Sequence, residues 1–297
     1  MFVPLRDFVL VGKRTTLAQI IKIKKNQILL LNMRVTLIGA GNMGGALAHG
    51  WLQSGEVSLT IADKNEGLLR SFAEAYPQAL EQGQLRITTD NRLAASEAEV
   101  LVLVVKPWLM PTVIAEIRDV VDTNTKLIVS DAANFTTGDL EQAFGRRGHF
   151  FYVIPNIAAQ YGASMSFVAR GAGVSDAQCS TVVSLYGLCG EVLEVQEQQV
   201  AAGMMMASCG IAYVMRMVRA MSLAGVEMGF YPQQAQHIAE QTMAGAVALL
   251  RESGLHPEAA IDKVTTPGGV TIKGLNEMDM AGFNAAVIRA LKAGMRN

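Results

Sequence analysis

The stretch that decides the fold of this chain is Val35-Thr36-Leu37-Ile38-Gly39-Ala40-Gly41-Asn42-Met43-Gly44. An apolar run of β type leads into the pattern Gly-x-Gly-x-x-Gly, and a helix-like segment follows it. In this context the first glycine permits a tight turn, the second lets backbone approach a pyrophosphate, and the third lets helix pack on strand. The N-terminus of the helix then offers free N–H groups to the phosphates. The pattern predicts dinucleotide binding, with a purely structural turn as the alternative, and the candidate contacts are Ile38, Gly39, Gly41, Asn42, Met43 and Gly44.

Length and composition narrow the class of protein. The 297 residues allow two domains, and 51% hydrophobic against 17% charged residues indicates large cores or a large subunit interface. A net charge of −1 gives no electrostatic basis for binding nucleic acid. The three cysteines form no Cys-x-x-Cys pair and the four histidines lie far apart, so we expect no metal and free thiols in a reducing cytoplasm. No apolar run reaches the ~18 residues of a membrane span.

Residues 1–32 differ from the rest of the chain. Six basic residues there face a single acid, Asp7, and apolar residues are interspersed. Such a composition occurs in targeting presequences, although no signal-peptide cleavage pattern is present. The alternative, which we favour, is that translation starts at Met33, one residue before the first expected strand. We therefore expect an N-terminal extension that is disordered or not translated.

Further β-type runs alternate with helix-like segments as far as residue 156. The expected strands are 58–63, 84–88, 99–105, 125–130 and 148–154. After Glu99, the strand 99–105 is a continuous run of valine and leucine, which is typical of a central parallel strand buried on both faces. This alternation predicts a doubly wound α/β domain of the Rossmann type, which we place at 33–160. The run 99–105 ends at Lys106-Pro107, where such a sheet places its ligand crevice.

Asp63 is the last residue of the second expected strand, 19 residues after Gly44. This spacing is close to the ~20 residues that separate a glycine turn from the acid that binds the adenosine ribose. A carboxylate there favours NADH, because it accepts from ribose hydroxyls and repels a 2′-phosphate. The next residues, Lys64 and Asn65, could instead contact that phosphate. A solvated strand end is the third interpretation.

Beyond residue 160 the hydrophobic period changes. Segments 175–188, 198–229 and 233–251 have helical spacing without further strand alternation, so we expect an all-α domain over 161–297. Its methionine-rich helix is typical of core or interface packing. These helices carry more apolar side chains than a small monomeric domain would bury, so we expect dimerisation through them.

The run Val264-Thr265-Thr266-Pro267-Gly268-Gly269-Val270-Thr271 carries the candidate chemistry of this second half. Gly268 and Gly269 expose backbone N–H groups where a helix begins, and we expect a positive φ at Gly269. Thr266 and Thr271 add hydroxyls. The combination predicts a small anion site suited to a carboxylate. A structural linker between two helices is the alternative.

Together these motifs resemble those of the pyrroline-5-carboxylate reductase family. The resemblance spans 33–295, and the Pro-Gly-Gly-x-Thr run is its specific part. It implies a Rossmann domain, an interlocking helical dimerisation domain, higher assembly in some members, and reduction of 1-pyrroline-5-carboxylate to proline with NADPH or NADH. It also implies that the strand end and Asn156 border the nicotinamide, so the further candidate cofactor contacts are Val105, Lys106, Pro107 and Asn156.

Two segments depart from the family pattern. Ile154-Pro155-Asn156-Ile157-Ala158 stands where the family usually has Met-Pro-Asn-Thr-Pro. Segment 207–213 reads Ala-Ser-Cys-Gly-Ile-Ala-Tyr in place of Ser-Gly-Ser-Gly-Pro-Ala-Tyr, and in the family this segment borders the substrate pocket. The alternatives are therefore a reductase of a related cyclic imine or 2-hydroxy acid, and a non-catalytic cofactor-binding redox sensor.

The expected reaction needs little acid–base machinery. A protonated cyclic imine is already electrophilic, so positioning beside the nicotinamide supplies most of the catalysis. Thr271 could hydrogen-bond the ring nitrogen while solvent delivers the proton, and Lys106 ranks as a positioning group before a catalytic acid. We expect a homodimer or larger homo-oligomer, and neither nucleic acid nor membrane as a partner.

Overall fold

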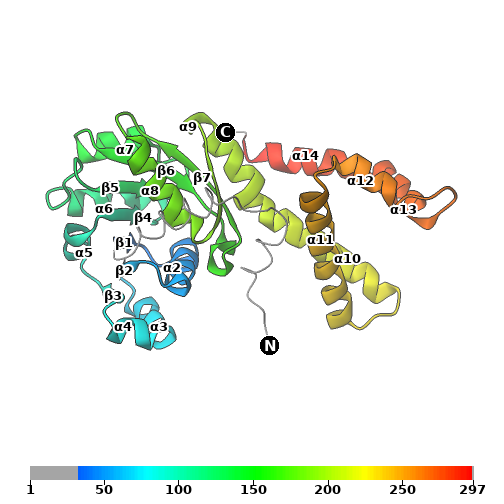
Figure 1. The fold of residues 1–297 in the computed structure, drawn as a ribbon, viewed down its shortest axis with the longest axis horizontal. Coiled ribbons are helices and arrows are strands. Elements are labelled where there is room, and N and C mark those ends of the chain that lie inside the picture. The colour runs from blue at the N-terminus through cyan, green and yellow to red at the C-terminus, as the bar shows by residue number, and fades with distance from the viewer. Residues whose placement is uncertain (1–32, 296–297) are drawn as a thin grey trace, which may run out of the picture. The chain divides into compact units, whose positions relative to one another are not determined.

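The computed structural model of the chain describes residues 33–295, in two compact units that divide between Ser208 and Cys209 (Figure 1). The first unit is built around one sheet with helices, and the second contains helices alone within its described part. The expectations for residues 1–32 fall outside the described residues.

An eight-stranded sheet forms the centre of the first unit, in the order β3-β2-β1-β4-β5-β6-β7-β8. Neighbours from β3 to β6 pair in parallel, β7 is antiparallel to β6, and β8 is parallel to β7. The order reverses beside β1, which makes a switch point beyond its carboxyl end. The doubly wound Rossmann prediction is confirmed. The strands are β1 Arg34–Ile38, β2 Ser58–Ala62, β3 Leu85–Thr88, β4 Val100–Leu103, β5 Leu127–Ser130, β6 His149–Ile154, β7 Ser164–Arg170 and β8 Gly190–Glu194.

Helices cover both faces of this sheet, because its central strands are apolar on both sides. Val100 and Val102 of β4 join the core under α2, α3 and α8, whereas Leu101 and Leu103 join the core under α5, α6 and α7. Period-two alternation of this kind follows from strand geometry. The helices are α2 Asn42–Ser54, α3 Glu66–Ala75, α4 Pro77–Glu81, α5 Asn91–Glu97, α6 Met110–Ile117, α7 Thr137–Phe144, α8 Asp176–Gly187 and α9 Glu197–Gly203, with short 3₁₀ turns η2 Pro107–Leu109 and η3 Ile157–Tyr161.

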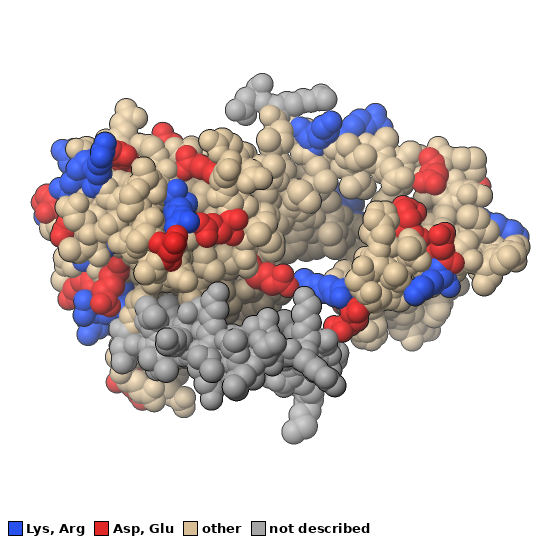
Figure 2. Space-filling view, turned by 45° about the horizontal axis from the view of Figure 1, so that its top comes forward, with Lys and Arg blue, Asp and Glu red and all other residues tan. Residues whose placement is uncertain are grey.

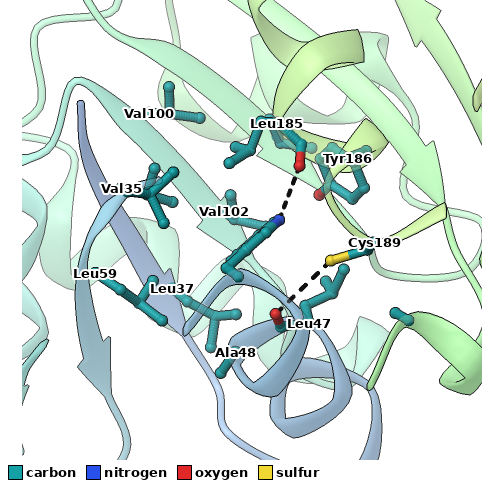
Figure 3. Close-up of a cluster of buried hydrophobic side chains, with 14 of the residues drawn as sticks. Val35, Leu37, Leu47, Ala48, Leu59, Val100, Val102, Leu185, Tyr186 and Cys189 are labelled. Atoms are coloured by element: carbon teal, nitrogen blue, oxygen red, sulfur yellow. Dashed lines mark hydrogen bonds between the residues drawn. The ribbon is translucent and has the colours of Figure 1, made fainter. Parts of the chain in front are cut away.

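Trp51 of α2 is the largest fully buried side chain in the core beneath α2 and α8. Its indole N–H donates to the carbonyl oxygen of Leu185 at 3.0 Å, and its ring meets Tyr186 edge to face at 5.7 Å. Figure 3 shows Leu185, Tyr186 and Cys189 facing this part of α2 across the core. An edge-to-face aromatic pair adds ~0.5–1.5 kcal/mol to the free energy gained by burying the two rings, so this contact attaches α8 to the half of the sheet that carries the glycine turn.

The structure differs from the domain boundary expected at residue 160. Both β7 and β8 lie beyond it, and the first unit extends to Ser208. The buried positions of β7 include Ser164 and Ser166, so polar residues occupy its core face and hide the alternation. Strand β8 is mostly exposed and carries two glutamates, so it has no hydrophobic pattern to recognise.

The second unit is thinly packed. Helices α10 and α11 form a close hairpin, because a Cβ on Gly225 would lie 2.8 Å from the Cβ of Ala235. The long helix α10 buries only small residues, and neither α13 nor α14 buries any. Many of the apolar side chains of this unit are exposed in the single chain. Its helices are α10 Gly210–Glu227, α11 Pro232–Ser253, α12 Pro257–Lys263, α13 Val270–Met280 and α14 Phe283–Ala293.

Candidate functional site

The glycine turn lies at the switch point, between β1 and α2. Gly39 has φ +102°, and a Cβ there would lie 2.8 Å from the carbonyl oxygen of Val104. A Cβ on Gly44 would lie 1.9 Å from the carbonyl oxygen of Gly39, whereas one on Gly41 would meet nothing within 4 Å. Gly41 is also the N-cap of α2 and provides no side-chain cap. The first and third glycines are therefore required by packing, and the second leaves open space before uncapped N–H groups.

The end of β4 lies against this turn. The N–H of Val104 donates to the carbonyl oxygen of Ile38 at 2.9 Å, and the Val105 side chain would be 2.9 Å from a Cβ on Gly39. Lys106 is exposed and precedes η2, whose 3₁₀ turn begins at Pro107. The structure thus brings Ile38, Gly39 and Val105 together, as expected for one crevice at the carboxyl edge.

Asp63 also reaches the glycine turn. Its Oδ2 accepts from the N–H of Ala40 at 2.7 Å, and its Oδ1 accepts from the N–H of Asn65 at 2.8 Å. Lys64 turns elsewhere, since its Nζ donates to Glu116 Oε1 at 2.9 Å. Of the two candidate phosphate contacts, Lys64 is thus ion-paired, and the Asn65 side-chain oxygen caps α3.

Asn156 follows β6, at the same edge of the sheet, and is 6% exposed. Its Oδ1 accepts from the N–H of Ala158 at 3.0 Å, and its Nδ2 donates to the carbonyl oxygen of Ala207 at 3.3 Å. Ala207 lies in a π-helical turn, η4 Met204–Cys209, where the wider spacing departs from the α-helical bonding pattern. The side chain of Asn156 therefore connects η3 to Ala207, and both belong to the first unit.

The Pro-Gly-Gly turn belongs to the second unit. Gly268 has φ +72°, whereas Gly269, the N-cap of α13, has φ −68°, so the expected positive φ falls one residue earlier. A Cβ on Gly269 would lie 2.6 Å from Thr266 Oγ1, which makes close approach the reason for glycine there. No side chain caps α13, and Thr266 and Thr271 are exposed. This turn therefore carries both the uncapped N–H groups of α13 and two exposed hydroxyl groups.

Asp131 is a buried acid at the carboxyl end of β5 that the sequence reasoning missed. It is 8% exposed, and the Tyr186 hydroxyl donates to its Oδ1 at 2.7 Å. Its Oδ2 has no hydrogen-bond partner among the described residues. Burial raises the pKa of Asp131 well above its usual value, and the Tyr186 hydrogen bond opposes that rise only partly. An acid directly after an apolar strand was the available signal.

Charge and composition bear on possible partners. On the face shown in Figure 2, Lys and Arg are interspersed with Asp and Glu, and neither sign forms a continuous field. Within residues 33–295 no group of three or more His, Cys, Asp and Glu side chains could hold a metal ion. In the same range one helical stretch, 197–227, is long and apolar enough to cross a membrane by length and composition alone. The sequence expectation missed it because charged residues interrupt its apolar run.

Two family models match the chain. One, described as NADP oxidoreductase, coenzyme F420-dependent, matches residues 34–134, and the other, described as pyrroline-5-carboxylate reductase dimerisation, matches residues 197–297. The pyrroline-5-carboxylate reductase of Methanosarcina acetivorans is 30% identical over 260 residues, covering 88% of this chain and 94% of the relative. Pyrroline-5-carboxylate reductase 3 of Danio rerio is 31% identical, covering 89% of this chain and 90% of the relative. The chain belongs to the pyrroline-5-carboxylate reductase family.

Solved structures of pyrroline-5-carboxylate reductases have the same fold. The one from Coxiella burnetii is 25% identical with a TM-score of 0.78, and the match covers 88% of this chain and 95% of the other. The one from Plasmodium falciparum, with NADP bound, is 23% identical with a TM-score of 0.78, and the match covers 89% and 96%. The predicted family and the predicted order of domains, Rossmann then helical dimerisation, are confirmed.

The match to the dimerisation model explains the packing of the second unit. The matched residues include the helices whose apolar side chains are exposed in the single chain, among them Met215, Leu223 and Ile238 at 52%, 54% and 45%. They also include the stretch 197–227 that would suit a membrane by length. Association between copies buries such side chains, so the chain forms a homo-oligomer.

Proposed function

We propose that the protein reduces 1-pyrroline-5-carboxylate to proline by hydride transfer from NADH or NADPH. One observation carries this proposal: an open glycine turn at the switch point occurs in the same chain as an uncapped Pro-Gly-Gly helix start with two hydroxyls. The first suits a pyrophosphate and the second a carboxylate. The relatives that share both halves of the chain are named pyrroline-5-carboxylate reductases.

The first unit holds the cofactor in this proposal. The open space at Gly41 fits a pyrophosphate, since a Cβ there would meet nothing, and the uncapped N-terminus of α2 attracts its charge. Asp63 accepts from the adenosine ribose. The cofactor, when bound, supplies the hydride. The residues that border it are Ile38, Gly39, Gly41, Asn42, Met43, Gly44, Asp63, Val105, Lys106, Pro107 and Asn156. Lys64 is paired with Glu116 instead.

The second unit holds the imino acid. The N–H groups beside Gly268 and Gly269 bind its carboxylate, and the hydroxyl of Thr266 supports them. The hydroxyl of Thr271 hydrogen-bonds the ring nitrogen and orients the C=N bond. The protonated imine is already electrophilic, so this chain contributes mainly position, worth up to ~7–11 kcal/mol in well-oriented systems. Solvent supplies the proton on nitrogen.

The proposal extends to partners and place. We place the enzyme in the cytoplasm as a homodimer or larger homo-oligomer, with neither nucleic acid nor membrane as a partner. The apolar stretch 197–227 then contributes to contact between copies.

Turnover assays on the purified full chain test this function. We expect oxidation of NADH or NADPH in the presence of 1-pyrroline-5-carboxylate, with proline formed in equal amount. A panel of other cyclic imines and of 2-oxo acids tests the altered segments 154–158 and 207–213. Turnover of one of those compounds alone would replace the substrate, and cofactor binding without any turnover would favour a redox sensor.

A further inference from the structure

We propose that this chain selects NADH over NADPH, and that Glu116 of α6 enforces the choice by holding Lys64 away from the adenosine ribose. The inference rests on the proposed function in one respect, that the glycine turn binds a nicotinamide dinucleotide. Three features of the described residues support it: an acid held by backbone N–H groups, a lysine held in an ion pair, and a helix N-terminus capped by a side chain.

The fixed acid is Asp63, at the end of β2. Two backbone N–H groups, from Ala40 and Asn65, hold one carboxylate oxygen each, at 2.7 and 2.8 Å. A carboxylate has about four acceptor positions, so each oxygen keeps one for a ribose hydroxyl. Because Ala40 belongs to the glycine turn, the carboxylate is oriented beside the place expected for the pyrophosphate. A 2′-phosphate would meet this fixed negative charge.

The ion-paired lysine is Lys64, the residue after Asp63 in the chain. Its Nζ donates to Glu116 Oε1 at 2.9 Å and to the carbonyl oxygen of Thr89 at 3.1 Å. Glu116 is itself fixed, since its Oε2 accepts from the amide of Asn91, which is 3% exposed, at 2.9 Å. The charge that could neutralise a 2′-phosphate is therefore already paired with α6.

The state of Glu116 supports this pairing. Partial burial acts to raise the pKa of Glu116, but the hydrogen bonds from Lys64 and Asn91 outweigh it and lower that pKa below its usual value. The carboxylate is accordingly charged at neutral pH and attracts Lys64. Because the Lys64 side chain is 64% exposed, the pair is weak, and a single substitution can release it.

The capped helix N-terminus is that of α3, which begins directly after Asn65. The side-chain oxygen of Asn65 accepts from the N–H groups of Gly67 and Leu68, at 2.9 and 3.4 Å. Glu66 adds a negative charge in the first turn. The N–H groups that could otherwise bind a phosphate at this end of α3 are thus occupied, and the local charge opposes an anion.

Equilibrium binding of NADH and NADPH to the full chain, without imine, tests the inference through the fluorescence of the reduced cofactor. We expect the wild-type chain to bind NADH at least about tenfold more tightly than NADPH, a difference of ~1.4 kcal/mol. Asp63→Asn keeps the shape but removes the charge, and should weaken NADH and strengthen NADPH. Glu116→Gln should strengthen NADPH about tenfold and leave NADH within about twofold.

Two further variants separate release of Lys64 from a general change of charge. Adding Lys64→Met to Glu116→Gln should abolish the gain in NADPH affinity, whereas Lys64→Met alone should leave NADPH affinity unchanged. The matched control is Glu97→Gln, which removes the same charge from a different exposed ion pair, with Arg86, and should change neither affinity.

Several results would overturn the inference. Equal or tighter binding of NADPH by the wild-type chain would do so, as would a gain in NADPH affinity that survives Lys64→Met. A loss of NADPH affinity in Lys64→Met alone would show that the lysine already contacts the phosphate. Tight, selective NADH binding without reduction of any imine would instead contradict the proposed function and leave this inference standing.

Discussion

The two units of this molecule differ in how many of their apolar side chains are buried within the single chain. Helix α2 of the first unit buries seven of its 13 residues, among them Trp51. Helix α10 of the second unit, with 18 residues, buries only Gly210, Ser222 and Gly225. The first unit therefore has its own core, whereas the second presents an apolar surface that a second copy must cover.

This contrast separates stability from assembly. Substitutions in the core of the first unit should lower the free energy of unfolding at any protein concentration. Substitutions on the exposed apolar face of the second unit should act through association, and their effect should depend on protein concentration. Four predictions test the contrast, in order of decreasing expected effect.

Trp51→Ala is expected to have the largest effect. The side chain is fully buried and its N–H is hydrogen-bonded, so its removal leaves a cavity and takes one of its donors from the Leu185 carbonyl oxygen. The loss should be ~3–5 kcal/mol, measured by urea unfolding at two protein concentrations. A loss below ~1 kcal/mol would contradict the self-sufficient core.

Leu223→Glu should break the assembly and leave the first unit folded. Leu223 is 54% exposed in the single chain, so a glutamate there costs little until a second copy covers it. Light scattering should show loss of the homo-oligomer, while binding of NADH to the first unit persists. The matched control is Leu80→Glu, on α4 of the first unit, at a leucine that is 38% exposed. Equal assembly of both variants would disprove the role of this face.

Thr271→Val tests the second unit in another way, because it removes a hydroxyl group and keeps the shape of the side chain. Loss of a hydrogen bond to a charged group, ~1.5–3 kcal/mol, should lower kcat/KM for the imine about tenfold to a hundredfold. Gly269→Ala should lower it further and also destabilise, because its Cβ would lie 2.6 Å from Thr266 Oγ1.

Parallel cofactor titrations on the same preparations are the control for these two variants. Both should bind NADH like the wild-type chain. Weaker cofactor binding in Thr271→Val, with the KM for the imine unchanged at saturating cofactor, would assign the turn to the cofactor and reverse the substrate assignment.

Asp131→Asn should have the smallest effect, and one that depends on pH. The pKa of Asp131 is raised by burial, so the folded state binds the proton more tightly than the unfolded state does. Its contribution to stability is complete below the unfolded pKa of ~3.9 and is lost as pH rises through the folded pKa. Asparagine keeps an acceptor for Tyr186 and does not ionise. The Tm of Asp131→Asn minus that of the wild-type chain should therefore rise with pH, and a constant difference would show that Asp131 does not titrate there.

The sequence predicted what depends on local pattern. The run 100–105 is apolar throughout and contains the central strand β4, and the glycine spacing placed the turn at the end of β1. Strand β7 was missed because Ser164 and Ser166 face its core side. The sequence pattern also could not predict contacts between residues that lie far apart in the chain. Lys64 and Glu116 lie 52 residues apart, and Asp131 and Tyr186 lie 55 apart, so only the folded sheet brings each pair together.

The free edges of the sheet carry a consequence for aggregation. Strand β8, at one edge, presents Glu191 and Glu194, and β3, at the other, presents Arg86. Like-charged or strongly hydrated side chains on an edge discourage another strand from pairing there, and both edge strands are short. Pairing of strands between copies is thereby disfavoured at both edges, whereas the residues matched to the dimerisation model lie at 197–297.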